Sequence, residues 1–130
     1  MMTRLLFLTA WLVLPIGQAH ASGLPLPKDA KRTIAAVHAA AESKDVRALR
    51  KLMKTDFVWS FGGYGSADQA IQAWQESPAQ LKELARVTSL ACSYVDPGIV
   101  QCPPDAGMDP RAGFEKGKSG WRMTYFVAGD

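Results

Sequence analysis

The sequence has little of what catalytic and metal sites are built from. It contains two cysteines and two histidines in 130 residues, with no GxSxG motif, no HExxH motif and no paired metal-ligand spacing. A structural metal site needs about four such ligands at short spacings. A Ser-His-Asp triad needs a histidine held beside its nucleophile. We therefore expect no metal and no cofactor, and we assign no catalytic residue on motif grounds.

The charges of the two signs nearly balance. The sequence has fifteen lysines and arginines and twelve aspartates and glutamates, which gives a formal net charge of +3. Domains that bind nucleic acid concentrate basic residues on one face, so we expect no nucleic-acid partner. The densest basic region surrounds one short predicted helix and is typical of a solvated helix face; its residues are Lys44, Arg47, Arg50, Lys51 and Lys54.

Long apolar runs are also scarce, and the only one lies at the start. Arg4 precedes an apolar run over residues 5–16, and Ala19-His20-Ala21 follows it. This order is typical of a secretory signal peptide, and the run is shorter than the ~20 residues of a membrane-spanning helix. We expect residues 1–21 to be cleaved and residues 22–130 to form a single domain. The expected location is periplasmic or secreted, with no membrane span after cleavage.

The first half of this domain predicts helices around one strand. A helix is expected from Pro27 or Lys28 to about Ser43, because apolar residues recur at helical spacing. Asp45 is expected to cap a second short helix that runs through Met53 and ends at Lys54-Thr55. A period-2 pattern over residues 57–61 then predicts a strand, and Gly62, Gly63 and Gly65 predict a tight corner. A phosphate cradle at these glycines is the less favoured alternative, because the P-loop lysine is absent.

Two further helices are expected after the corner. Ser66 and Gln69 match the capping-box pattern. Ser77, Pro78 and Gln80 repeat it, with serine as the cap and proline at the first helical position. The two helices would therefore meet at a bend near Ser77.

The second half predicts an antiparallel meander. Strands are expected over residues 90–94, 99–102, 111–116 and 121–127, and in the last of them Trp121, Met123, Tyr125 and Val127 alternate with Arg122, Thr124 and Phe126. Asp96-Pro97-Gly98 is a strong turn signal between the first two strands. A three-residue loop there places Tyr94 opposite Val100 and Cys92 opposite Cys102, within disulfide reach. We predict a Cys92–Cys102 disulfide, which suits an exported chain.

The order of these elements resembles the nuclear transport factor 2-like superfamily, which includes the ketosteroid-isomerase-like and SnoaL-like proteins. Residues 49–61, the helix after Ser66 and the closing segment GWRMTYFVAGD over residues 120–130 carry this resemblance. It implies an α+β fold in which N-terminal helices pack on a curved antiparallel sheet, as a cone-like roll with an internal pocket. Isomerases of the superfamily use an acidic base with a tyrosine and a second acid. No local motif assigns these roles here, and the helix at Ser77 and the Cys92–Cys102 hairpin depart from the simplest pattern.

Aromatic and acidic residues supply the candidates for function. Trp59, Tyr64, Trp74 and Trp121 are the expected ligand-binding residues, against a more common role as core. Asp56 is the candidate acid or base, since a carboxyl in an apolar pocket gains a raised pKa; Glu76 and Glu115 are weaker candidates. All three carboxylates also fit ordinary boundary positions.

Three functions remain open at this stage. The first is a non-catalytic binding or accessory domain for a small apolar ligand. The second is a small cone-fold enzyme, an isomerase, dehydratase or hydrolase, which needs a buried carboxylate. The third is an interaction or inhibitor protein that binds an envelope protein, which needs a large exposed apolar patch.

Overall fold

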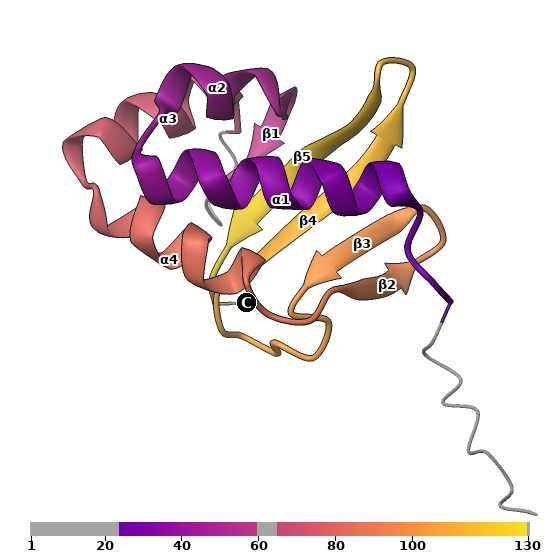
Figure 1. The fold of residues 1–130 in the computed structure, drawn as a ribbon. Helices are drawn as coiled ribbons and strands as arrows, with labels where there is room; N and C mark the ends of the chain where they lie inside the picture. Colours follow the sequence, from indigo (N-terminus) through magenta and orange to yellow (C-terminus); the bar gives the residue numbers. More distant parts are fainter. Residues whose placement is uncertain (1–23, 60–64, 130) are drawn as a thin grey trace, which may run out of the picture.

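In the part of the chain that the structure describes, four helices form a layer on one side of a five-stranded sheet (Figure 1). The computed structural model describes residues 24–59 and 65–129. The predicted signal peptide, the glycines at 62 and 63, and Tyr64 lie outside the described residues. No helix within the described ranges is both long and apolar enough to cross a membrane.

The helices begin and end largely where local signals place them. α1 spans Lys28–Ser43 and ends at Lys44, whose φ of 58° is left-handed. α2 spans Val46–Lys51, and the Asp45 carboxylate accepts a hydrogen bond from the Ala48 amide at 3.0 Å. α3 spans Ala67–Glu76, and the Ser66 hydroxyl accepts one from the Gln69 amide at 3.1 Å. The predicted first helix and both of these caps are confirmed.

α4 spans Ala79–Thr88 and starts differently from the prediction. Its N-cap residue is Pro78, in a right-handed helical conformation, and no side chain caps it. The amide of Gln80 instead donates to the main-chain carbonyl of Ser77 at 3.1 Å. The predicted Ser77 cap is therefore wrong, because the short link from α3 continues directly into a turn that uses main-chain atoms.

The sheet has the strand order β1-β5-β4-β3-β2. Its strands are β1 Met53–Val58, β2 Ser93–Asp96, β3 Ile99–Cys102, β4 Arg111–Gly117 and β5 Gly120–Val127. The pairs formed by β2 to β5 are antiparallel, whereas β1 pairs with β5 in parallel. The predicted α+β class, with N-terminal helices packed on the sheet, is confirmed, and the sheet is mostly rather than wholly antiparallel.

The parallel pairing also corrects the end of the second helix. Leu52 accepts a main-chain hydrogen bond from Met123 at 2.7 Å, and Met53 pairs with Met123. Contact with β5 therefore draws residues from Met53 onward into a strand, although the sequence predicts them to continue the helix to Lys54-Thr55. This pairing joins segments far apart in the chain, which local periodicity does not reveal.

A bulge in β5 changes which of its side chains face the helices. The β4–β5 register shifts between the pairs Gly113–Tyr125 and Phe114–Met123. One extra residue reverses the alternation beyond it. Phe126 therefore joins Trp121 and Met123 on the helix side, and Tyr125 lies on the other face. The prediction of one uninterrupted alternation from Trp121 to Val127 is wrong for this reason.

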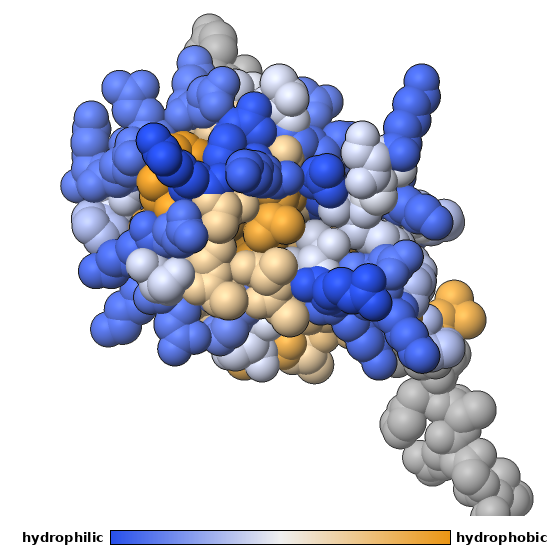
Figure 2. Space-filling view, turned by 45° about the horizontal axis from the view of Figure 1, so that its top comes forward, coloured by the Kyte–Doolittle hydropathy of each residue, from blue (hydrophilic) through white to orange (hydrophobic). Residues whose placement is uncertain are grey.

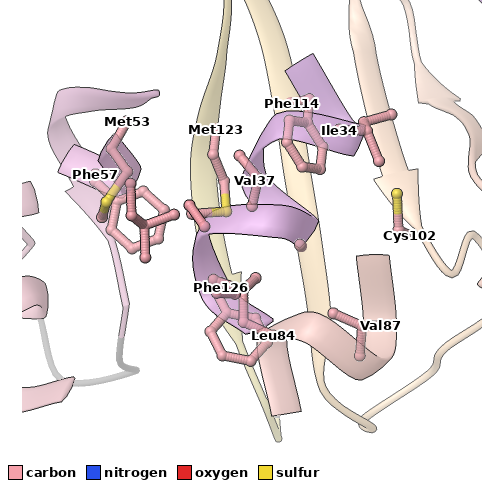
Figure 3. Close-up of a cluster of buried hydrophobic side chains, with 14 of the residues drawn as sticks. Ile34, Val37, Met53, Phe57, Leu84, Val87, Cys102, Phe114, Met123 and Phe126 are labelled. Atoms are coloured by element: carbon pink, nitrogen blue, oxygen red, sulfur yellow. The ribbon is translucent and has the colours of Figure 1, made fainter. Parts of the chain in front are cut away.

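The core lies between the helices and this face of the sheet. Figure 3 shows Val37 of α1 between Met123 of β5 and Phe114 of β4, with Leu84 and Val87 of α4 farther along the same core. Phe57 and Trp74 meet edge to face at 5.7 Å between ring centroids, and Trp74 meets Phe126 at 5.9 Å. This chain of rings joins β1, α3 and β5.

A disulfide between Cys92 and Cys102 holds the start of the β2–β3 hairpin to the sheet. Tyr94 pairs with Val100, as the turn predicted, and the Cα atoms of the two cysteines are 4.3 Å apart. The predicted disulfide is thus confirmed. A bond of this kind points to an oxidising, extracytoplasmic environment.

Candidate ligand-binding site

The predicted aromatic residues separate into two places in the fold. Trp59 and Trp74 line one cavity of about 450 Å³, which we call the aromatic pocket. Trp121 lines a different cavity of about 520 Å³ at the other end of β5. Tyr64 lies outside the described residues, so it belongs to neither description.

The aromatic pocket lies where α3 meets α4 and where β1 and β5 end. Its volume falls within the ~300–1,000 Å³ typical of small-molecule sites. None of the described residues that line it has a charged side chain. The lining residues are Trp59, Ala73, Trp74, Ser77, Gln80, Pro110, Phe126, Val127 and Ala128.

The aromatic wall of this pocket is fixed by the core. Trp74 is 2% exposed and lies between Phe57 and Phe126 in two edge-to-face contacts. Because these rings pack from three different elements, the wall cannot move without disturbing the core. The wall therefore offers a preformed apolar surface to a ligand.

Trp59 contributes the unusual polar atom of the pocket. Its side chain is half-buried, and the indole Nε1 is buried without a hydrogen-bond partner among the described residues. Buried donors of this kind nearly always have a partner, and the indole N–H is a donor only. The pocket is therefore lined by a residue whose indole donor no described group satisfies.

Ser77 and Gln80 add polar groups at the exposed side of the pocket. Ser77 lies in the connection to α4 and Gln80 in the first turn of that helix, where the sequence predicts a capping box. Since the Ser77 hydroxyl is not used as a cap, it is left at the pocket. Sequence reasoning missed both residues as pocket residues, and it missed Phe126 because the bulge was not foreseen.

Trp121 is buried in the core beside α1. It is 5% exposed, and its carbonyl oxygen accepts a bond from the Thr33 hydroxyl of α1 at 3.5 Å. Its cavity also includes the charged residues Asp29, Glu115 and Lys116, whereas the described lining of the aromatic pocket has none. The structure does not bring Trp121 together with Trp59 and Trp74.

The candidate acids do not lie in apolar pockets. Asp56 and Glu76 are exposed, and Glu115 makes an ion pair with Lys54 at 3.5 Å. In residues 24–59 and 65–129 the buried polar residues are Thr88 and Gln101, neither of which is a carboxylic acid. The arrangement that the enzyme hypothesis needs is therefore not found in this part of the chain.

His38 holds two helices together. Its Nδ1 lies 2.8 Å from the carbonyl oxygen of Ala85 in α4, and its Nε2 lies 3.0 Å from a carboxylate oxygen of Glu42. Since a carbonyl oxygen only accepts, Nδ1 carries the proton of that contact. The described ranges contain no group of three His, Cys, Asp or Glu residues placed to hold a metal ion.

The surface of the helical layer is mixed. Figure 2 shows an apolar area framed by hydrophilic side chains on this side of the molecule. On α1 the exposed residues include Ala35, Ala36 and Ala39. Among the described residues, the exposed large hydrophobic ones are Leu24, Val58, Leu90, Val95 and Met108.

The comparison with solved structures found partial similarity. One match is an NTF2-like protein with a cystatin-like fold from Novosphingobium aromaticivorans, with a TM-score of 0.41, 18% identity, and coverage of 75% of this chain and 76% of that one. Another is an M. tuberculosis LEH-like epoxide hydrolase, with a TM-score of 0.42, 14% identity, and coverage of 81% of this chain and 80% of that one. No protein-family model matches the sequence, and no curated protein matches it.

The first of these structures carries the name of the superfamily that the order of elements resembles. Both identities are below 20% and both TM-scores are below 0.5. Structural similarity at this level assigns no role to any residue of this chain. Function is therefore argued from the pocket itself.

Proposed function

We propose that the protein is an exported, non-catalytic binding domain that holds a small, uncharged and largely apolar molecule in the aromatic pocket. Export is supported by the Cys92–Cys102 disulfide and by the signal-peptide pattern of residues 1–21. We place the protein in the periplasm or outside the cell.

The observation that carries this proposal is the composition of the pocket. Trp74 and Phe126 supply apolar walls, and the Trp59 indole supplies a donor without a partner in the described residues. Because the described residues of the lining include no charged side chain, a charged ligand would lose its hydration without compensation from them. A neutral molecule with one hydrogen-bond acceptor, such as a ketone or an ether, matches these groups.

Binding without catalysis is the simpler reading of the same site. A general acid or base must reach the reacting atoms, and among the described residues the pocket lining contains no Asp, Glu, His, Lys, Cys or Tyr. The alternative of a cone-fold enzyme with a buried carboxylate has no carboxylate in the described residues to support it.

Three naphthalene derivatives test the proposal by tryptophan fluorescence titration. We expect 2-acetylnaphthalene to bind about two- to tenfold more tightly than naphthalene, because it can accept one hydrogen bond, and 2-naphthoate to bind most weakly. In Trp59→Phe, which keeps an aromatic ring but removes the donor, the preference for the ketone should disappear. The matched variant Trp121→Phe should keep it. Equal binding of all three compounds, or equal effects of the two substitutions, would count against the proposal.

A further inference from the structure

A second hollow lies between α1 and the segment that follows α4, which we call the α1–α4 groove. It encloses about 460 Å³ and shares no lining residue with the aromatic pocket. Its apolar wall comes from Leu26, Ile34 and Ala35 on one side and from Leu90 and the disulfide-bonded Cys92 on the other. Leu90 is 40% exposed, although it contributes to this wall. The groove is thus an apolar surface that the described part of the chain leaves open.

Most polar side chains of the groove already have partners. The Thr88 hydroxyl donates to the Leu84 carbonyl at 2.8 Å, and the Ser89 hydroxyl donates to the Arg86 carbonyl at 2.5 Å. His38 is bonded to Ala85 and Glu42. These groups therefore serve the fold, and each would have to give up a contact to bind a ligand.

Lys31 is the exception. It lines the groove from α1, is exposed, and has no ion-pair partner among the described residues. The neighbouring acid on α1, Asp29, pairs with Arg32 at 3.6 Å. None of the described residues that line the groove is acidic. The groove therefore combines an apolar wall with a single available ammonium group.

We propose that the α1–α4 groove binds single-chain amphiphiles that carry a carboxylate, such as medium-chain fatty acids. The acyl chain lies along Ile34, Ala35 and Leu90, and the carboxylate lies at the Lys31 ammonium group. The apolar wall gains affinity from each buried methylene, and the ammonium group selects the sign of the head group. This site is independent of the aromatic pocket and of the function proposed for it.

A free amphiphile fits the groove better than a membrane surface does. Binding to an anionic bilayer needs several basic residues on one face. The exposed part of α1 carries the acids Asp29 and Glu42 as well as the bases Lys28 and Arg32, and Asp29 pairs with Arg32, so this helix does not present a purely basic face to an anionic bilayer. The charge complementarity is thus limited to one group, as a single carboxylate requires.

Titration calorimetry below the micelle concentration tests the proposal, with decanoate, octanoate and 1-decanol as probes and the disulfide-bonded protein as sample. We expect decanoate to bind at one site, with each added methylene strengthening binding by about two- to fourfold. Lys31→Gln should lower the affinity for decanoate by about two- to fivefold and leave the affinity for 1-decanol unchanged. The matched variant Lys51→Gln, an exposed lysine on α2, should change neither.

Amide chemical shifts locate the ligand. Decanoate should move the signals of Ala35 and Leu90 and leave those of Ala73 and Ala128 at the aromatic pocket in place. Leu90→Asp, at a partly exposed position, should abolish binding while the protein stays folded. Signal changes at the aromatic pocket instead of the groove would overturn the proposal, as would an equal loss of decanoate affinity in Lys31→Gln and Lys51→Gln. Equal affinities for 1-decanol and decanoate would also overturn it. So would binding of phosphatidylglycerol vesicles without binding of free decanoate.

Discussion

Replacing Gly113 with alanine should destabilise the protein through one side chain, that of Tyr125. Gly113 pairs with Tyr125 across β4 and β5, and a Cβ atom at position 113 would overlap the Tyr125 ring. The ring crosses β4 to reach β3, where the Tyr125 hydroxyl donates to the Gln101 side-chain oxygen at 2.5 Å. An alanine at 113 must therefore displace the ring and break this bond.

The size of the effect follows from the parts that are lost. A broken hydrogen bond of this kind costs about 0.5–1.5 kcal/mol, and forcing a methyl group into packed space costs about 1–3 kcal/mol. Gln101 is 9% exposed, and its amide group still donates to the Pro103 carbonyl at 2.9 Å, which limits how far it can turn to find water. We expect Gly113→Ala to lower the free energy of unfolding by about 2–4 kcal/mol.

Urea denaturation measures this loss of unfolding free energy in four proteins: wild type, Gly113→Ala, Tyr125→Ala and the double variant. Once the ring is gone, alanine at 113 should cost little, because glycine is itself unfavourable inside a strand. The coupling energy between the two sites should therefore be at least about 1.5 kcal/mol. A cost for Gly113→Ala below about 0.5 kcal/mol, or an equal cost in both backgrounds, would refute the reasoning.

The remaining predictions concern a titration and the disulfide. Burial raises the pKa of Tyr125 above 10.0; Arg111 opposes the rise and Asp96 adds to it. The folded state therefore holds the phenol proton more tightly than the unfolded state does. The free energy of unfolding should be unaffected below pH 10 and should fall as the pH rises through the folded pKa. Tyr125→Phe should flatten that part of the curve of unfolding free energy against pH, and an unchanged slope would contradict the assignment. The Cys92→Ala/Cys102→Ala variant should lose about 2–3 kcal/mol, as expected for a ten-residue separation, and a loss below about 1 kcal/mol in urea denaturation would show that the bond contributes little.

The features that the sequence predicted correctly depend on neighbours in the chain. The first helix follows from the spacing of its apolar residues. The Ser66 cap depends on Gln69, three positions away, and the Cys92–Cys102 bond depends on one short turn. In each case the deciding interaction spans a few residues, so the local pattern contains it.

The features that it missed depend on partners far away in the chain. Met53 becomes a strand residue because it meets Met123, and Phe126 turns inward because β5 bulges against β4. The candidate site was predicted in part for the same reason. Trp59 and Trp74 share a pocket, but their separation from Trp121 follows from the length of β5, and the contribution of Phe126 follows from the bulge.

The position of β5 bears on how the polypeptide is made. This strand follows every other strand in the sequence, yet it lies inside the sheet, with β1 on one side and β4 on the other. Until residues 120–127 have been synthesised, β1 has no partner and the helices lack Trp121, Met123 and Phe126 to pack against. The parallel pairing of β1 therefore has to wait for residues 120–127, which makes this step of folding late relative to the synthesis of β1.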